Sequence, residues 1–511
     1  MTEQRTDTTG RWVLLATILA SSMAFIDSTV VNVALPSIQT ALDATVSELQ
    51  WIVEAYLLFL ASLILVGGSL GDHYGRKRVF GLGVALFAAA SAWCGFAGSA
   101  GQLVLARALQ GVGGALLTPG SLAIITAYFV EEQRGRAIGM WSAFSAMTTL
   151  IGPVLGGWLV DNGSWRWVFL INLPVAAVVL AALYLRVPES KDGEAARRLD
   201  WGGALFATLG LGGISYGLIE SSNLGLSDPT IMTALIGGIL LLGIFVLYES
   251  RIRQPMMPLG MFKNSTFSGA NLLTFFLYGA LSWVTFFAPL NLIQIQGYTG
   301  TQFGLAFIPF PILLFLLSTY AGGLVPKIGA RPLLVSGSLL VAAGFFWFGW
   351  TGQVGSSWGG YFANYFPVMV LMGLGMSAVA APLSATVMGA VTLERSGIAS
   401  GINNAVARTA SLVIIAFCGL LAVVWFGQSL EARVAELGLP APAQQELLAQ
   451  RTRLAEAQPP DGLSEITEMA VRQAVNGAFL TSFRYTMWLT AGLAVLSAGV
   501  AWITIPARLN Q

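Results

Sequence analysis

Charged side chains and histidine are scarce in this 511-residue chain. Only 10% of the residues are Asp, Glu, Lys or Arg, whereas a soluble domain carries about a quarter. His73 is the single histidine, and the two cysteines, Cys94 and Cys418, lie far apart. One histidine and two distant cysteines are too few ligands for a zinc site. A net charge of +1 argues against nucleic acid as a partner.

Long hydrophobic runs take the place of the missing charge, and hydrophobic residues make up 55% of the chain. A bilayer core accommodates about 20 apolar residues per helix. Runs of that length predict an all-α integral membrane protein with about fourteen spans. The first run is too long for the core of a signal peptide and should remain as a helix. The expected spans are 12–35, 51–70, 79–99, 102–129, 137–160, 165–187, 201–221, 230–250, 267–290, 301–325, 332–352, 363–390, 397–426 and 478–505.

The distribution of Lys and Arg predicts the orientation. With the N-terminus inside, most of them fall in inner segments, and Arg166 is the one in a short outer loop. Positive residues accumulate on the cytoplasmic side of membrane proteins. We therefore expect a multi-pass protein of the plasma (bacterial inner) membrane with both termini in the cytoplasm.

A weak internal repeat suggests two related halves. Segments 68–75 and 322–329 share glycines seven residues apart and a leucine at the third position. Repeated halves are typical of transporters, in which two bundles rock about a central site. We predict a six-helix bundle over 1–187, an inserted helix pair over 188–264, and a second six-helix bundle over 265–511. An extracytoplasmic loop, 427–477, should form two polar amphipathic helices.

Two acids lie well inside the predicted spans, where a charge costs at least ~2.5–3.5 kcal/mol. Asp27 has polar neighbours, including Asn32, that give the first span a partly wet face. Glu54 lies one turn into the second span, where a carboxylate can reach water. Intramembrane acids are functional by default, although Asp27 could also be a structural partner of an arginine.

Arg107 in the fourth span is the obvious partner for Asp27. Gln110 and Gly111 follow it within one turn, and glycine permits close helix approach. An ion pair whose attraction depends on protonation is a physical basis for proton coupling. A static ion pair is the alternative.

Other polar and small residues in the spans have two interpretations each. Gly152, Pro153, Gly156 and Gly157 form a small-residue face suited to helix packing. Asn403, Asn404 and Arg408 could line a cavity, as could Asn32 and Gln110, or bond neighbouring helices. Seven aromatic residues of the ninth and eleventh spans we expect mostly to face lipid, with some lining a site: Phe275, Phe276, Phe286, Phe287, Phe345, Phe346 and Trp347.

Five motifs in order resemble the major facilitator superfamily and, within it, the 14-helix drug:proton antiporters. They are Asp27 to Pro36, Gly68-x-Leu70-Gly71-Asp72-x2-Gly75-Arg76-Lys77, Arg107-x2-Gln110-Gly111, Gly152-Pro153-x2-Gly156-Gly157, and Trp165-Arg-Trp167-x-Phe169-x2-Asn172-x-Pro174. The resemblance covers nearly the whole chain except 427–477.

The resemblance implies a 6+2+6 arrangement of helices and alternating access. It implies that Asp27 and Arg107 couple transport to protons, and we add Glu54 as a further acid that could take part. It also implies that the loop bearing Gly68, Asp72, Gly75 and Arg76 is part of a conformational latch. Gly152 to Gly157 match the fifth-helix motif of the exporters.

We therefore expect a secondary transporter that exports drugs or other small amphipathic molecules in exchange for protons. A dedicated exporter of one metabolite or antibiotic is the alternative; a membrane-embedded enzyme or receptor is remote, because no nucleophile with its base is visible. Substrates should be neutral or monocationic, because only Asp27 and Glu54 offer negative charge within the spans. We expect a monomer that needs no metal or cofactor and is driven by the proton gradient.

Overall fold

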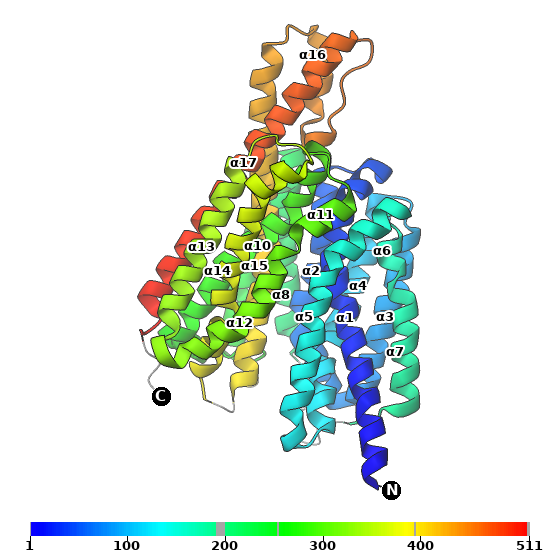
Figure 1. The fold of residues 1–511 in the computed structure, drawn as a ribbon, viewed down its shortest axis with the longest axis vertical. Coiled ribbons are helices and arrows are strands. Elements are labelled where there is room, and N and C mark those ends of the chain that lie inside the picture. Colours follow the sequence, from blue (N-terminus) through cyan, green and yellow to red (C-terminus); the bar gives the residue numbers. More distant parts are fainter. Residues whose placement is uncertain (1, 191–199, 253–254, 393–394, 508–511) are drawn as a thin grey trace. The chain divides into compact units, whose positions relative to one another are not determined.

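The computed structural model describes residues 2–190, 200–252, 255–392 and 395–507, and most of them are helical. The first part of the chain contains α1 (Thr2–Leu42), α2 (Val46–Tyr74), α3 (Arg76–Phe96), α4 (Ala100–Tyr128), α5 (Glu131–Asn162), α6 (Trp167–Leu170), α7 (Asn172–Arg186), α8 (Trp201–Leu224) and α9 (Pro229–Glu249) (Figure 1). It continues with η1 (Leu259–Lys263), α10 (Ser265–Pro289), η2 (Leu290–Ile295), α11 (Gly300–Phe307), α12 (Pro309–Ile328) and α13 (Ala330–Trp350). The last elements are α14 (Trp358–Gly389), α15 (Ser396–Ala435), α16 (Ala441–Ala449), η4 (Arg451–Glu456) and α17 (Glu465–Thr504).

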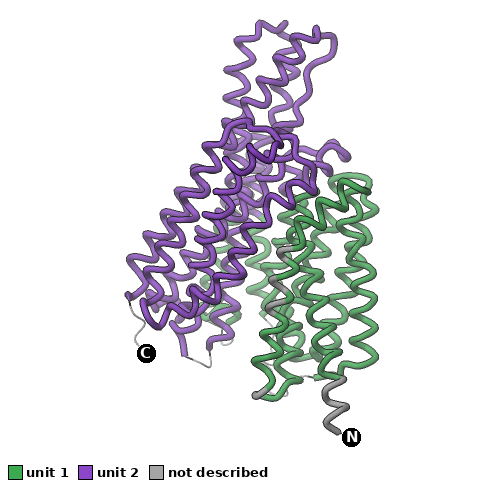
Figure 2. Tube along the Cα trace, viewed as in Figure 1, with its two compact units in different colours: residues 1–34, 51–212, 237–259 green, residues 35–50, 213–236, 260–511 purple. Residues whose placement is uncertain are grey.

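The chain divides into two compact units, shown in green and purple in Figure 2. Unit 1 comprises residues 1–34, 51–212 and 237–259, and unit 2 comprises 35–50, 213–236 and 260–511. Residues of the predicted inserted pair therefore fall into both units. The predicted boundaries of 1–187, 188–264 and 265–511 stay a prediction.

Thirteen helices within the described residues are long and apolar enough to cross a membrane. They match thirteen of the fourteen predicted spans. The remaining predicted span, 137–160, falls within α5. A multi-pass membrane protein is confirmed, while the count of fourteen spans stays a prediction.

The sequence repeat corresponds to the same tight connection in each unit. Gly75 separates α2 from α3 with a φ of 113°, and Gly329 separates α12 from α13 with a φ of 84°. Glycine adopts this region without the penalty that a Cβ imposes. Serine caps begin other helices, because their hydroxyls accept from an otherwise unpaired amide. Ser99 caps α4 in this way, and Ser357 caps α14.

Glycines let the helices of unit 1 approach closely. A Cβ on Gly113 of α4 would lie 2.6 Å from the backbone nitrogen of Phe87 in α3. On α5, a Cβ on Gly152 would overlap the Thr29 hydroxyl of α1, and one on Gly156 would lie 3.2 Å from the Cα of Val30. The Gly152 to Gly157 motif thus supplies a packing face for α1, as expected for a face of small residues.

Aromatic side chains fill the interior of unit 2, where α10 packs against α15 and α17. Phe287 of α10 stacks on Phe483 of α17 with centroids 5.7 Å apart, and Trp283 lies 4.6 Å from Phe287. Phe286, Phe287 and Phe345 are fully buried. These three are therefore exceptions among the seven aromatic residues expected mostly to face lipid, whereas Phe346 and Trp347 are exposed. Apolar residues serve a helix interface and the lipid equally well, so the sequence does not distinguish the two.

The segment 427–477, here called the cap, is built from the ends of two long helices. Helix α15 runs on to Ala435 and α17 begins at Glu465, with α16 and η4 between them (Figure 1). Arg453 of η4 forms an ion pair with Asp43 at 2.8 Å, and its carbonyl accepts from Gln39 at the end of α1. Two separate amphipathic helices were expected; instead, the spanning helices extend into the cap.

Candidate functional site: a buried ion pair beside an apolar cavity

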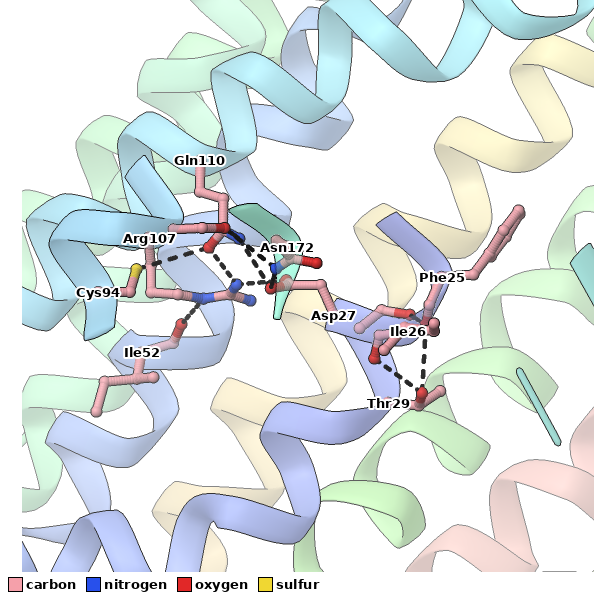
Figure 3. A network of polar contacts seen from close by, with 11 residues as sticks. Phe25, Ile26, Asp27, Thr29, Ile52, Cys94, Arg107, Gln110 and Asn172 are labelled. Carbon is pink, nitrogen blue, oxygen red and sulfur yellow. Dashed lines mark hydrogen bonds and ion pairs between the residues drawn. The ribbon is translucent and has the colours of Figure 1, made fainter. Parts of the chain in front are cut away.

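Asp27 lies on α1 in the interior of unit 1 and is 0% exposed. The polar residues beside it do not stabilise the carboxylate. Ser28 and Thr29 donate instead to carbonyls of their own helix, those of Phe25 and Ile26 (Figure 3). The hydroxyls of the expected wet face therefore bond within α1. The hydrogen bonds to the carboxylate come from other helices.

Arg107 of α4 is the partner of Asp27. Its Nη1 lies 2.5 Å from Asp27 Oδ2, and its Nε donates to the Ile52 carbonyl of α2 at 3.0 Å. The guanidinium carbon lies 4.3 Å from the ring centroid of Tyr56. Arg107 is 1% exposed, and an arginine cannot lose its charge in a protein. The pairing expected from the sequence is present, and it joins α1, α2 and α4.

Gln110 closes a ring with the ion pair. Its Nε2 donates to Asp27 Oδ1 at 2.8 Å, while its Oε1 accepts from Arg107 Nη1 at 2.7 Å. The same amide nitrogen lies 2.7 Å from the Ser91 hydroxyl, and the Cys94 thiol donates to Oε1 at 3.6 Å. Gln110 is thus bonded on both sides within the network.

Asn172, at the start of α7, is the third donor to Asp27. Its Nδ2 lies 3.4 Å from Asp27 Oδ1 and 3.1 Å from Ser91 Oγ. Figure 3 shows Arg107, Gln110 and Asn172 converging on the carboxylate. Three donors from two helices, α4 and α7, therefore hold the carboxylate in place.

A cavity of about 530 Å³ lies beside this network in unit 1. Its walls come from α1, α5 and the start of α7, and most are apolar. Asn172 is part of the wall, so one side chain contacts both the cavity and Asp27. The apolar walls include Ile18, Met23, Ile26, Phe144, Met147 and Ile151.

Glu54 is 0% exposed on α2. The expectation that its carboxylate reaches water is wrong for this structure, because the side chain is fully buried. Its part in proton coupling stays a prediction.

The structure brings the latch residues together at the turn between α2 and α3. Asp72 and Arg76 form an ion pair at 2.8 Å. Gly75 is needed for its positive φ and because a Cβ there would lie 2.9 Å from the Glu189 carboxyl. Glu189 also accepts from the Lys77 amide at 2.9 Å. Gly68 lies earlier, within α2, next to Pro119 of α4.

The remaining predicted residues lie apart from this network. In unit 2, Asn403 of α15 donates to Thr274 and Asn271 of α10 at 2.7 and 3.2 Å, which is a bond between helices. Asn404 donates to the Ser400 carbonyl of its own helix, and Arg408 is half-buried. Asn32 is half-buried on α1 of unit 1.

Sequence reasoning missed three members of the network. Asn172 carried a signal, because it is an amide at the edge of a span within the Trp165 to Pro174 motif. Ser91 and Cys94 carried none, since small polar residues occur in many spans at helix contacts.

A family model described as Major Facilitator Superfamily matches residues 17–416. The chain is 36% identical over 447 residues to the multidrug resistance protein Stp of Mycobacterium tuberculosis, covering 86% of this chain and 80% of that protein. It is 30% identical over 504 residues to the tetracenomycin C resistance and export protein of Streptomyces glaucescens, covering 98% and 92%.

Among solved structures, a bacterial homolog of the human lysosomal transporter Spinster has a similar fold. That crystal structure, inward-facing and occupied, gives a TM-score of 0.67 at 18% identity, and 97% of this chain and 96% of that chain are covered. A D-xylose-proton symporter gives 0.58 at 17% identity, with 97% and 98% covered. At these identities the likeness is one of fold.

Proposed function

The chain belongs to the major facilitator superfamily, and we propose that it exports drugs or related small amphipathic molecules in exchange for protons. Family and fold class agree with the sequence-based identification, and the chain is a transporter rather than an enzyme. The observation that carries the proposal is the buried Asp27–Arg107 ion pair. Its carboxylate also accepts a hydrogen bond from Asn172, a residue of the cavity wall.

The buried pair supports proton coupling on energetic grounds. Removing one partner of such a pair costs about 3–5 kcal/mol, since it leaves an uncompensated charge. Protonation of Asp27 removes the negative charge in the same way, so it weakens the tie between α1 and α4. A proton bound at this point therefore changes which packing of these helices is stable. Arg107 holds the carboxylate in place, and Gln110 and Asn172 orient it.

The cavity supports an amphipathic substrate. Methionine, leucine, isoleucine and phenylalanine side chains line α1 and α5 there, and such walls adapt to apolar molecules of different shape. Asn172 offers one amide at the end nearest Asp27. A molecule that engages this amide competes directly for a donor to Asp27, which links occupancy of the cavity to the proton.

The proposal has two forms, export of many drugs and export of a single compound. One relative is named a multidrug resistance protein, and another is named for resistance to and export of tetracenomycin C. The cavity favours the multidrug form, because its wall is apolar except for Arg11, Ser22, Thr148 and Asn172. Export of a single metabolite or antibiotic is the alternative. We further propose a monomer with both termini in the cytoplasm, driven by the proton gradient with no cofactor.

The test is transport by the full chain in proteoliposomes with an imposed pH gradient. Asp27→Asn keeps the size of the side chain and one accepting oxygen but cannot exchange a proton, so gradient-driven transport should be lost. Asp461→Asn alters an exposed acid of the cap and is the matched control. Thermal unfolding checks that both variants are folded. Undiminished proton-driven transport by a folded Asp27→Asn variant would falsify the proposal.

A further inference from the structure

A second pair of buried acids lies in unit 1, at the ends of α8 and α9. Asp200 directly precedes α8 and Glu249 is the last residue of α9. They are 8% and 2% exposed. The sequence separates them by nearly fifty residues, so the fold alone brings them together.

One oxygen of each carboxyl group lies beside the other group. Asp200 Oδ1 accepts from the Gly203 amide at 2.8 Å, and Glu249 Oε2 accepts from the Met257 amide at 2.9 Å. A Cβ on Gly203 would lie 2.5 Å from Glu249 Oε1 and 2.7 Å from Asp200 Oδ2. The absence of a side chain at Gly203 thus leaves the space in which these two oxygens meet.

Glu249 Oε1 is buried and receives no hydrogen bond from a donor in the described part of the chain. Its neighbour is Asp200 Oδ2, because both oxygens lie within 2.7 Å of the position that a Cβ on Gly203 would take. Two ionised carboxylates at this separation repel each other strongly, whereas one shared proton converts the repulsion into a hydrogen bond. A proton shared by the two carboxyl groups therefore explains why Glu249 Oε1 has no other hydrogen-bond donor.

We propose that Asp200 and Glu249 bind one proton between them, at a site separate from the Asp27 network. Asp200 holds the negative charge, because it caps the N-terminus of α8, where the helix dipole favours an anion. Glu249 holds the proton and donates from Oε1 to Asp200 Oδ2. Tyr248 is the other titratable side chain placed against the pair among the described residues, and it faces Asp200.

The bound proton joins the start of α8 to the segment that follows α9. Glu249 accepts from Met257, and the Met256 amide lies 3.5 Å from Asp200 Oδ2. Loss of the proton places two negative charges in one buried space. The contacts to Met256 and Met257 should then loosen, which makes this connection sensitive to alkaline pH.

Infrared difference spectroscopy of the purified full chain tests the proposal without measuring transport. On stepping from neutral to alkaline pH, the wild type should lose a carbonyl stretch of a protonated carboxylic acid. Glu249→Gln and Asp200→Asn should each abolish that change, because each removes one half of the shared site. Glu446→Gln, an exposed acid of α16, should leave it intact.

A second measurement has a readout in the wild type alone, which holds even where a variant fails to fold. Amide exchange at Met256 and Met257 should speed up at alkaline pH in the wild type beyond the intrinsic pH effect, and Glu249→Gln should abolish the excess. A wild type with no pH-sensitive carboxyl band, or a band that persists in a folded Glu249→Gln protein, overturns the proposal. Asp27→Asn should leave the band unchanged, so this proposal and proton-coupled export fail separately.

Discussion

Asn172 makes the longest of the three hydrogen bonds to the Asp27 carboxylate, 3.4 Å between Nδ2 and Oδ1, and the same side chain forms part of the cavity wall. The bonds from Arg107 and Gln110 to the same carboxylate are 2.5 and 2.8 Å. The contact that a bound molecule can reach is therefore the longest of the three, and we expect it to be the weakest.

Asn172→Ala should weaken gradient-driven transport, because the variant removes the one side chain that contacts both the cavity and the Asp27 carboxylate. Transport in proteoliposomes at a fixed pH gradient measures the effect, and thermal unfolding checks that the variant is folded. Asn404→Ala is the control, since Asn404 is exposed and bonds only its own helix in the described contacts. Equal transport by the two folded variants would show that Asn172 has no part in linking the cavity to Asp27.

Gly152→Ala should destabilise the protein, because the added methyl group overlaps the Thr29 hydroxyl of α1. Overpacking of this kind costs about 1–3 kcal/mol. Gly139→Ala is a matched control on the same helix, where a Cβ meets nothing within 4 Å. Thermal unfolding of the purified variants is the measurement. Adding Thr29→Ala to Gly152→Ala should restore part of the loss; equal stability of the two glycine variants contradicts close packing here.

Singly charged cations should be transported better than dications. If Asp27 carries one proton inward, expelling a monocation moves no net charge across the membrane. Expelling a dication moves one positive charge outward against an inside-negative potential, at ~2.3 kcal/mol per 100 mV. This lowers the attainable gradient about fifty-fold, since each 1.4 kcal/mol is a factor of ten. Proteoliposome transport of paired compounds with one or two quaternary ammonium groups tests it, and equal transport contradicts it.

The attachment of the cap should weaken as pH rises. Burial raises the pKa of Glu456, although the Thr40 hydroxyl and Arg453 lower it. A carboxyl whose pKa is raised by folding stabilises the fold below its ordinary pKa of about 4.3. That contribution is lost as pH rises through the raised value. Amide exchange over residues 451–456 should show it, and Glu456→Gln should remove the dependence while Glu446→Gln retains it. Equal pH dependence in both variants would contradict this assignment.

Sequence reasoning reached the spans and the central ion pair for physical reasons. Bilayer thickness sets span length, and a deep acid such as Asp27 needs a partner of opposite charge such as Arg107. The rest of the network was beyond reach, because Ser91 and Cys94 differ from other small residues only in where their helix faces. Burial was beyond reach for the same reason: Phe287 and an aromatic residue in contact with lipid have the same hydropathy. Asp200 and Glu249 lie at span ends, where acids are common, and only the fold shows that they meet.

Helices α15 and α17 are each 40 residues long. At 1.5 Å per residue this is about 60 Å, roughly twice the hydrocarbon thickness of a bilayer. Each of these helices thus has one part among the membrane spans and one part in the cap. A tilt of about 10° in such a rod displaces its far end by roughly 10 Å. A spectroscopic label on α16 would therefore magnify a tilt of these helices within unit 2, and the cap is the natural place from which to follow the working cycle.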